Sequence, residues 1–94
     1  MSLFGFTFAR IDGGSMEPVL PSGSMALFRR RKTVVKGDIV LADHPEFGVI
    51  VKRVRAIEPD GALALEGTAP QSTSAQRLGS VEPARVRGVL LKHW

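Results

Sequence analysis

The sequence contains no cysteine, so neither a disulfide framework nor a thiolate metal site is available to it. It has only two histidines, His44 and His93, which argues against a histidine-rich metal site and against a Ser-His-Asp triad. We therefore expect a protein that works without a metal ion or other cofactor.

Long apolar runs are also missing. The runs present, such as Val49 to Val51 and Val89 to Leu91, are far shorter than the roughly 20 residues that a membrane-spanning helix needs. The first residues contain no basic region before an apolar core, and Arg10 and Asp12 follow at once, so they do not read as a signal peptide. The expected protein is soluble, and either cytoplasmic or peripherally associated with a membrane.

The 94 residues are expected to form a single domain, 1–94, of the all-β class. Helical periodicity is nearly absent, and short alternating or apolar segments are separated by Gly, Pro and Asp. The turn sequence of Glu58 to Gly61 predicts a hairpin whose second strand is the ALALE segment. The other predicted strands are Leu3 to Ile11, with Phe4, Phe6 and Phe8 on one face, Met25 to Arg30, Asp38 to Asp43, Gly48 to Ile57 and 86–94, with a polar loop from Gly67 to Ser80.

The formal net charge is +4, and the densest basic cluster is the RRRK run, Arg29 to Lys32. Such a run can contact phosphates of nucleic acid or anionic lipid. No stacking aromatics interleave with it, Phe28 being its only aromatic neighbour, and no recognition-helix pattern surrounds it. These features favour a solvated loop; peripheral contact with an anionic membrane stays open, and nucleic acid is not the expected partner.

Lys52 occupies an unusual position in the longest predicted strand. By the period of two, its side chain shares a face with the apolar Ile50 and Val54, whereas Arg53 and Arg55 project from the other face. Burying an unpaired ammonium group is costly, so the structural alternatives are a salt bridge, a stem that reaches the surface, or a different register. The functional interpretation is a desolvated lysine with a lowered pKa that acts as a general base.

Ser15 lies in the segment GGSMEPVLPSG, between residues that bend a backbone. Taken alone, a serine after two glycines is typical of a surface turn. A serine nucleophile needs a base, and Ser-Lys pairs are an established variant of serine catalysis. Gly13 and Gly14 would let the backbone approach a substrate, and the Ser15 amide would help to hold an oxyanion.

These segments resemble the boxes of the clan that contains signal peptidase I and the SOS-repressor proteases (S24/S26-like). The resemblance rests on GGSMEPVLPSG, KGDIVLAD, VIVKRV and VRGVLL, in this order, and it covers the chain from Ile11 to Leu91. It implies a compact, coiled, barrel-like β-sheet domain, with Ser15 as nucleophile and Lys52 as general base. Short members without a membrane anchor, the maturation proteases of nickel superoxide dismutase, are similar in size and layout.

The third box of the clan is matched less well, by Gly67 to Gly79. The resemblance implies that Ser72 orients the lysine. Thr68 and Ala69 replace an Asp-Asn pair, and Ser74 stands at the start of a replaced Asp-Ser-Arg, which removes a supporting ion pair. Further departures are Gly13 in place of a side-chain oxyanion donor and Ser24 in place of an aspartate.

We expect a serine endopeptidase that cleaves a protein precursor bound as an extended strand beside the Ser15 loop, with Met16 and Pro18 lining its groove. The phenylalanine face could line the same groove, or belong to the core. Two alternatives remain open at this point. One is a non-catalytic relative that binds peptides, and the other is a nucleic-acid-binding β-barrel that uses the run from Arg29 to Lys32.

Overall fold

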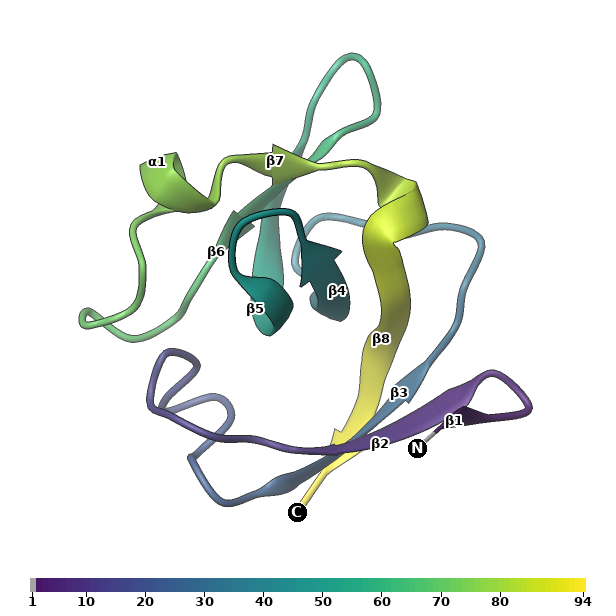
Figure 1. Ribbon diagram of the computed structural model, residues 1–94, viewed down its shortest axis with the longest axis vertical. Coiled ribbons are helices and arrows are strands. Elements are labelled where there is room, and N and C mark those ends of the chain that lie inside the picture. Colours follow the sequence, from purple (N-terminus) through teal and green to yellow (C-terminus); the bar gives the residue numbers. More distant parts are fainter. Residues whose placement is uncertain (1) are drawn as a thin grey trace.

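Eight strands form one antiparallel sheet in the computed structural model, which describes residues 2–94. The sheet curls strongly, so that β2 and β3 face the β4–β5 hairpin across the molecule (Figure 1). Its strand order is β1-β2-β3-β8-β4-β5-β6-β7, which confirms the all-β prediction. The strands are β1 (Ser2–Leu3), β2 (Phe6–Arg10), β3 (Met25–Arg29), β4 (Ile39–His44), β5 (Gly48–Ile57), β6 (Leu63–Glu66), β7 (Ser80–Val81) and β8 (Val86–His93).

The β4–β5 hairpin is the best-predicted part of the fold. Strand β5 has the predicted bounds, and Lys52 pairs with Val40 of β4. The predicted turn after β5 is present, since the amide of Gly61 donates to the carbonyl of Glu58 at 2.8 Å. Strand β6 then returns beside the second half of β5, as expected for its hairpin partner.

Two predictions of secondary structure were wrong. The stretch predicted as one strand from Leu3 to Ile11 is a hairpin, because Phe4 and Gly5 turn with positive φ values of 53° and 81°. Phe4 is therefore 90% exposed at the tip of this turn rather than on a strand face. The region predicted as a polar loop contains helix α1 (Ala75–Leu78), which Ser74 caps by accepting a hydrogen bond from the amide of Arg77 at 3.2 Å.

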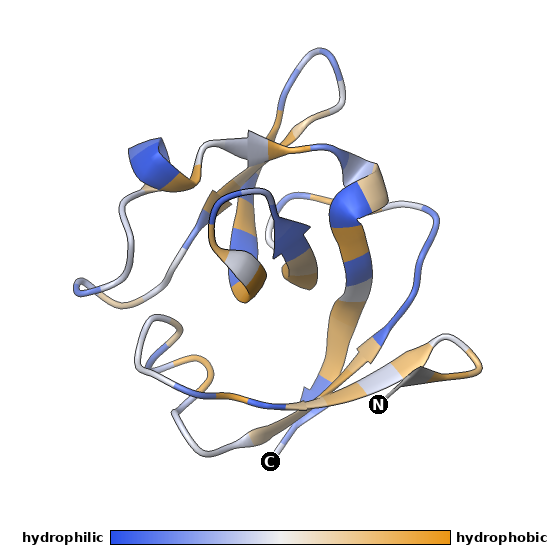
Figure 2. Ribbon diagram, in the orientation of Figure 1, coloured by the Kyte–Doolittle hydropathy of each residue, from blue (hydrophilic) through white to orange (hydrophobic). Residues whose placement is uncertain are grey.

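The core consists of two clusters. One lies between β4, β5, β6 and β8 and includes Leu78 of α1; the other joins Phe28 of β3 to Met16 and Leu20 of the Ser15 loop. Figure 2 shows the hydrophobic residues concentrated in the strands. Because β8 pairs with both β3 and β4, it holds the two halves of the sheet together. No helix among residues 2–94 has the length and apolar character needed to span a bilayer.

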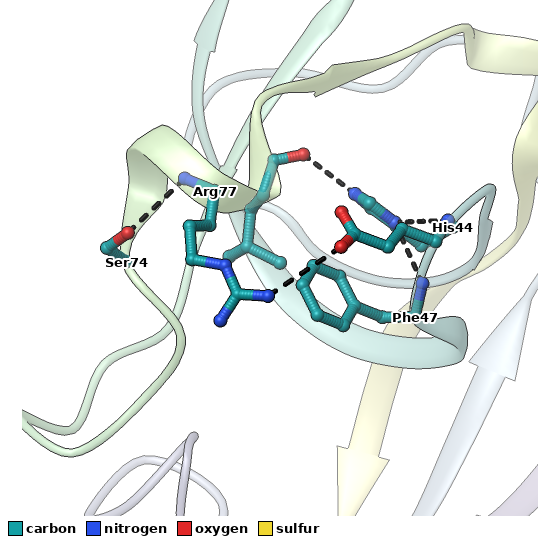
Figure 3. A network of polar contacts seen from close by, with 6 residues as sticks. His44, Phe47, Ser74 and Arg77 are labelled. Carbon is teal, nitrogen blue, oxygen red and sulfur yellow. Dashed lines mark hydrogen bonds and ion pairs between the residues drawn. The ribbon is translucent and has the colours of Figure 1, made fainter.

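A buried histidine fixes α1 to the β4–β5 turn (Figure 3). The Nδ1 atom of His44 accepts from the amides of Glu46 at 3.0 Å and Phe47 at 3.2 Å. Its Nε2 lies 2.7 Å from the carbonyl oxygen of Leu78, so Nε2 carries the proton and donates it there. Arg77 covers this site, 5.2 Å from the Phe47 ring centroid and 3.6 Å from the carboxylate of Glu46. With both ring nitrogens engaged, His44 has a structural role and does not face the cavity described next.

Candidate active site

A cavity of about 290 Å³ opens between the end of β2, the Ser15 loop and the first half of β5. It brings together two residues that lie 37 positions apart in the sequence, Ser15 and Lys52. Apolar side chains form most of its wall, and the charged side chains of Arg10 and Asp12 stand at its exposed edge. The residues lining it are Ala9, Arg10, Ile11, Asp12, Ser15, Met16, Leu41, Val49, Ile50, Val51 and Lys52.

Lys52 reaches the cavity from the middle of the sheet, and its side chain is only 6% exposed. This confirms the sequence-based expectation that it projects from the core face. No acidic partner or hydrogen bond for its ammonium nitrogen is found within residues 2–94. Over the same residues, every side-chain nitrogen and oxygen that is fully buried has a hydrogen-bond partner. Because Lys52 Nζ has no partner, it is not fully buried, and its remaining exposure is to the cavity that Lys52 lines. Desolvation by burial lowers the pKa of Lys52 below its ordinary value of 10.5.

The backbone of Ser15 is held by the segment that follows β6. The Ser15 carbonyl accepts two hydrogen bonds, from the amide of Thr68 at 2.9 Å and from the amide of Ala69 at 3.0 Å. The hydroxyl of Thr68 also donates to the carbonyl of Glu17 at 3.0 Å, and Gln71 Nε2 donates to the carbonyl of Gly14 at 3.3 Å. Four contacts from one segment therefore position the turn that carries the serine.

Apolar anchors and one capping hydroxyl complete the Ser15 loop. Met16 is 1% exposed and Leu20 is fully buried in the core, and they flank the turn on the side away from solvent. The amide of Gly13 donates to Ser22 Oγ at 3.1 Å, so this amide is already engaged. The amides of Gly14 and Ser15 donate no hydrogen bond within the described chain. Two backbone donors in the turn that carries Ser15 are therefore free.

Ser15 and Lys52 share the cavity, but no hydrogen bond joins them in the described structure. The Ser15 hydroxyl is likewise without a partner among residues 2–94. Catalytic hydrogen bonds are often loose before substrate binds and tighten only in the complex. The cavity is therefore lined by Ser15, with its free hydroxyl and amide, and by the desolvated amine of Lys52, which are groups that acyl transfer uses.

Comparison with known families agrees with this set of components. The family model described as Peptidase S24-like matches residues 5–86, which is most of the chain. The chain belongs to the Peptidase S24-like family. This membership supports a protein of the peptidase kind and confirms the clan to which the sequence boxes pointed. A search of curated proteins found no significant match.

In this S24-like domain, the segment that departs from the third family box packs directly against the Ser15 loop. A Cβ atom on Gly67 would overlap the side chain of Ser72 and lie 2.8 Å from the carbonyl oxygen of Ser15. Ser72 Oγ makes a long contact of 3.4 Å to the carbonyl of Thr73, and no hydrogen bond to Lys52 is found in the part of the chain described. The lysine-orienting role of Ser72 remains a prediction.

The residues predicted to line a substrate groove are placed differently from one another. Met16 lines the cavity, whereas Pro18 is exposed and lies outside its lining. The phenylalanine face does not reach the cavity either, since Phe4 and Phe8 are exposed elsewhere and Phe6 lies under Arg29.

Sequence reasoning did not find the cavity wall that comes from β2. Ala9 to Asp12 lie next to Val49 to Lys52 only because the sheet curls, and no local pattern marks that contact. The alternation of β2 was the available signal, but it does not tell which strand lies opposite.

Two strand segments bordering the cavity have an unpaired edge. Ala9 and Arg10 pair with β3 on one side, while β1 pairs only with Phe6 and Thr7 within the described chain. On β5, the stretch from Val49 to Lys52 pairs with β4, and β6 begins its pairing only at Arg53. Backbone donors and acceptors on both borders of the cavity are therefore open to a third strand.

Proposed function

We propose that this protein is a serine endopeptidase that uses Ser15 as nucleophile and Lys52 as general base. The observation that carries the proposal is the meeting of Ser15 with a buried, unpaired lysine in one cavity of a Peptidase S24-like domain. A structural lysine at 6% exposure would be expected to have a carboxylate partner. The absence of one within residues 2–94 is explained if the amine has to be neutral and free.

The first step is attack of Ser15 Oγ on the scissile carbonyl carbon, while the neutral Lys52 amine takes the hydroxyl proton. The carbonyl oxygen becomes negatively charged and is stabilised by the free amides of Gly14 and Ser15. Lys52, now an ammonium ion, returns the proton to the leaving amine as the C–N bond breaks. Water then attacks the acyl-enzyme ester with Lys52 again as base, which releases the acid product and restores Ser15.

The substrate binds as an extended strand between the free edges of β2 and β5. Main-chain hydrogen bonds to Ala9–Asp12 and Val49–Lys52 supply affinity without reading sequence, as in other strand-addition complexes. Met16, Leu41 and Ile11 form a buried apolar floor beside Ser15, so the side chain next to the cleaved bond is expected to be small or aliphatic. The likeness to signal peptidases and maturation proteases suggests that the substrate is a protein precursor.

The test uses a peptide library, with cleavage products identified by mass spectrometry. Ser15→Ala and Lys52→Ala are each expected to abolish cleavage while their circular dichroism and melting temperature show a folded protein. Ser80→Ala and Lys36→Ala remove the same chemical groups from exposed positions outside the cavity, so they should cleave like the parent protein.

Two outcomes would contradict the dyad. Equal residual cleavage by the parent protein and both dyad variants would identify a contaminating protease. Retention of a library peptide without cleavage by the parent protein would instead identify a non-catalytic, peptide-binding relative.

A further inference from the structure

The charges of this chain are divided between two parts of the fold. One part consists of the segments that contain β1, β2, β3 and β8, namely residues 2–10, 25–37 and 86–94. It carries eight of the thirteen Lys and Arg residues and none of the nine Asp and Glu residues. All acidic residues belong to the rest of the chain. The half of the sheet built from these segments is therefore strongly cationic, while the remainder is net acidic.

The same half carries the aromatic side chains that are exposed among the described residues. Phe4 is 90% exposed at the tip of the β1–β2 hairpin, and Phe8 and Trp94 are about half exposed. The rings of Phe8 and Trp94 meet edge to face, with centroids 6.1 Å apart. Leu3 and Leu91 are also exposed on these strands. Among the described residues outside these segments, the exposed large hydrophobic side chains are aliphatic, namely Val19, Val49 and Ile57.

Aromatic and basic side chains are directly adjacent on this surface. The guanidinium carbon of Arg29 lies 5.6 Å from the Phe6 ring centroid. Phe4 and Arg30 line one shallow hollow, and the run from Arg29 to Lys32 lines another with Leu91. Figure 2 shows the hydrophobic β1–β2 hairpin beside the hydrophilic stretch that follows β3.

We propose that this aromatic-basic face, formed by Leu3, Phe4, Phe8, Leu91 and Trp94 with Arg29 to Lys32, docks the protein on an anionic lipid bilayer. Phe4 and Leu3 enter the interface, and the cationic run binds lipid phosphates around them. Tryptophan is favoured at the membrane–water interface, where Trp94 would lie, because its ring is apolar and its N–H is polar. The proposal is independent of the peptidase chemistry.

Two other occupants fit these observations less well. A symmetric contact with a second copy would place the two basic runs against each other, and like charges repel. Single-stranded nucleic acid needs open ring faces for its bases. Here Phe8 and Trp94 contact each other edge to face, and Leu3 and Leu91 offer no ring for stacking. Phe4 is then the one largely open ring of the described face, too few for a row of stacked bases.

Docking would also orient the candidate active site. Ala9 and Arg10, which follow Phe8 on β2, line the cavity that contains Ser15. The aromatic-basic face and the cavity therefore share β2, so a protein docked through this face would hold its cavity in one orientation relative to the bilayer.

The experiment uses the full chain carrying Ser15→Ala, so that the result does not depend on peptidase activity. Vesicles of phosphatidylglycerol mixed with phosphatidylcholine are compared with vesicles of phosphatidylcholine alone, by co-sedimentation and by tryptophan fluorescence. Trp94 is the only tryptophan, so its emission reports on this face directly. We expect the protein to sediment with the anionic vesicles alone and the Trp94 emission to shift to the blue when they are added. Added salt should weaken this binding.

Paired variants test the two parts of the face. Arg30→Gln with Arg31→Gln should lower the partition coefficient about 25-fold, because each charge near an anionic surface contributes a factor of about five. Arg55→Gln with Arg77→Gln lowers the net charge equally on the other half and should have little effect. Phe4→Asn, which suits the positive φ at this turn, should reduce binding about tenfold, whereas Ile57→Asn should not.

Four results would overturn the proposal. Equal binding to both vesicle types would exclude anionic recognition, and equal effects of the two arginine pairs would exclude this face. Dimerisation that buries Trp94, or salt-dependent binding to an oligonucleotide without binding to vesicles, would assign the face to another partner.

Discussion

The two buried polar side chains of the described core, Lys52 and His44, lie on neighbouring strands and have opposite surroundings. His44 is 7% exposed and both of its ring nitrogens are hydrogen-bonded to backbone groups. Lys52 is 6% exposed and is without a partner in the described structure. A buried group with all its partners stabilises a fold, whereas an unpaired one costs stability and marks a site for chemistry.

The segment between Gly67 and Leu78 connects the two sites. Its end is attached to His44 through the carbonyl of Leu78, and its beginning holds the carbonyl of Ser15 through Thr68 and Ala69. One short stretch therefore couples the structural histidine to the position of the candidate nucleophile.

The largest expected effect comes from Lys52→Met, which keeps the stem and removes the amine. Peptide cleavage should fall about 10³- to 10⁴-fold because the general base is lost. The free energy of unfolding should rise by about 1 kcal/mol, because a poorly solvated amine is replaced by an apolar group. Chemical denaturation and cleavage assays measure the two quantities. A loss of both activity and stability would show that Lys52 has a structural role.

Gly67→Ala tests how the Ser15 loop is positioned. The added methyl group would meet Ser72 and the carbonyl oxygen of Ser15, so we expect a loss of about 2 kcal/mol of stability and roughly a tenfold fall in kcat/KM. Gly61→Ala is the control, since its φ of 91° costs stability while no atom lies near the new methyl group. Equal kcat/KM in the two variants would contradict a positioning role.

For His44→Leu we expect the opposite pattern to Lys52→Met. The substitution leaves the amides of Glu46 and Phe47 and the carbonyl of Leu78 without their partner, which should cost about 2–3 kcal/mol of stability. Well below the melting temperature, kcat/KM should stay near that of the parent, because Thr68 and Ala69 still hold Ser15. Loss of cleavage in a fully folded variant would mean that the histidine contributes to the site itself.

The smallest effect is a dependence of stability on pH. Because burial lowers the pKa of Lys52 in the folded state, the unfolded chain binds more protons between that lowered pKa and 10.5. The contribution of this residue to the free energy of unfolding should therefore rise with pH across that window. Cleavage should rise through the same folded-state pKa.

The measurement is the difference in unfolding free energy between the parent protein and Lys52→Met as pH increases from neutral. A flat difference would mean that the lysine titrates at its ordinary pKa and is not desolvated.

Much of the fold could be predicted because strand signals are local. Gly48 to Ile57 and the turn from Glu58 to Gly61 follow from alternation and turn chemistry alone. The hairpin at Phe4 and helix α1 were missed for different reasons. Phe4 turns the backbone with a positive φ, but the alternating sequence pattern from Leu3 to Ile11 continues through this turn and gives no sign of it. Helix α1 has a single turn, which is too short to show a helical period in the sequence.

By itself the sequence determined that Lys52 lies on an apolar face and that Ser15 lies in a bent, glycine-flanked loop, because side-chain direction in a strand and turn preference depend on near neighbours. Only the tertiary structure decided that the two share one cavity, that Lys52 has no partner among residues 2–94, and that the exposed aromatic and basic side chains gather on one half of the sheet. These are consequences of sheet curvature and of pairings between distant strands, which no local pattern encodes.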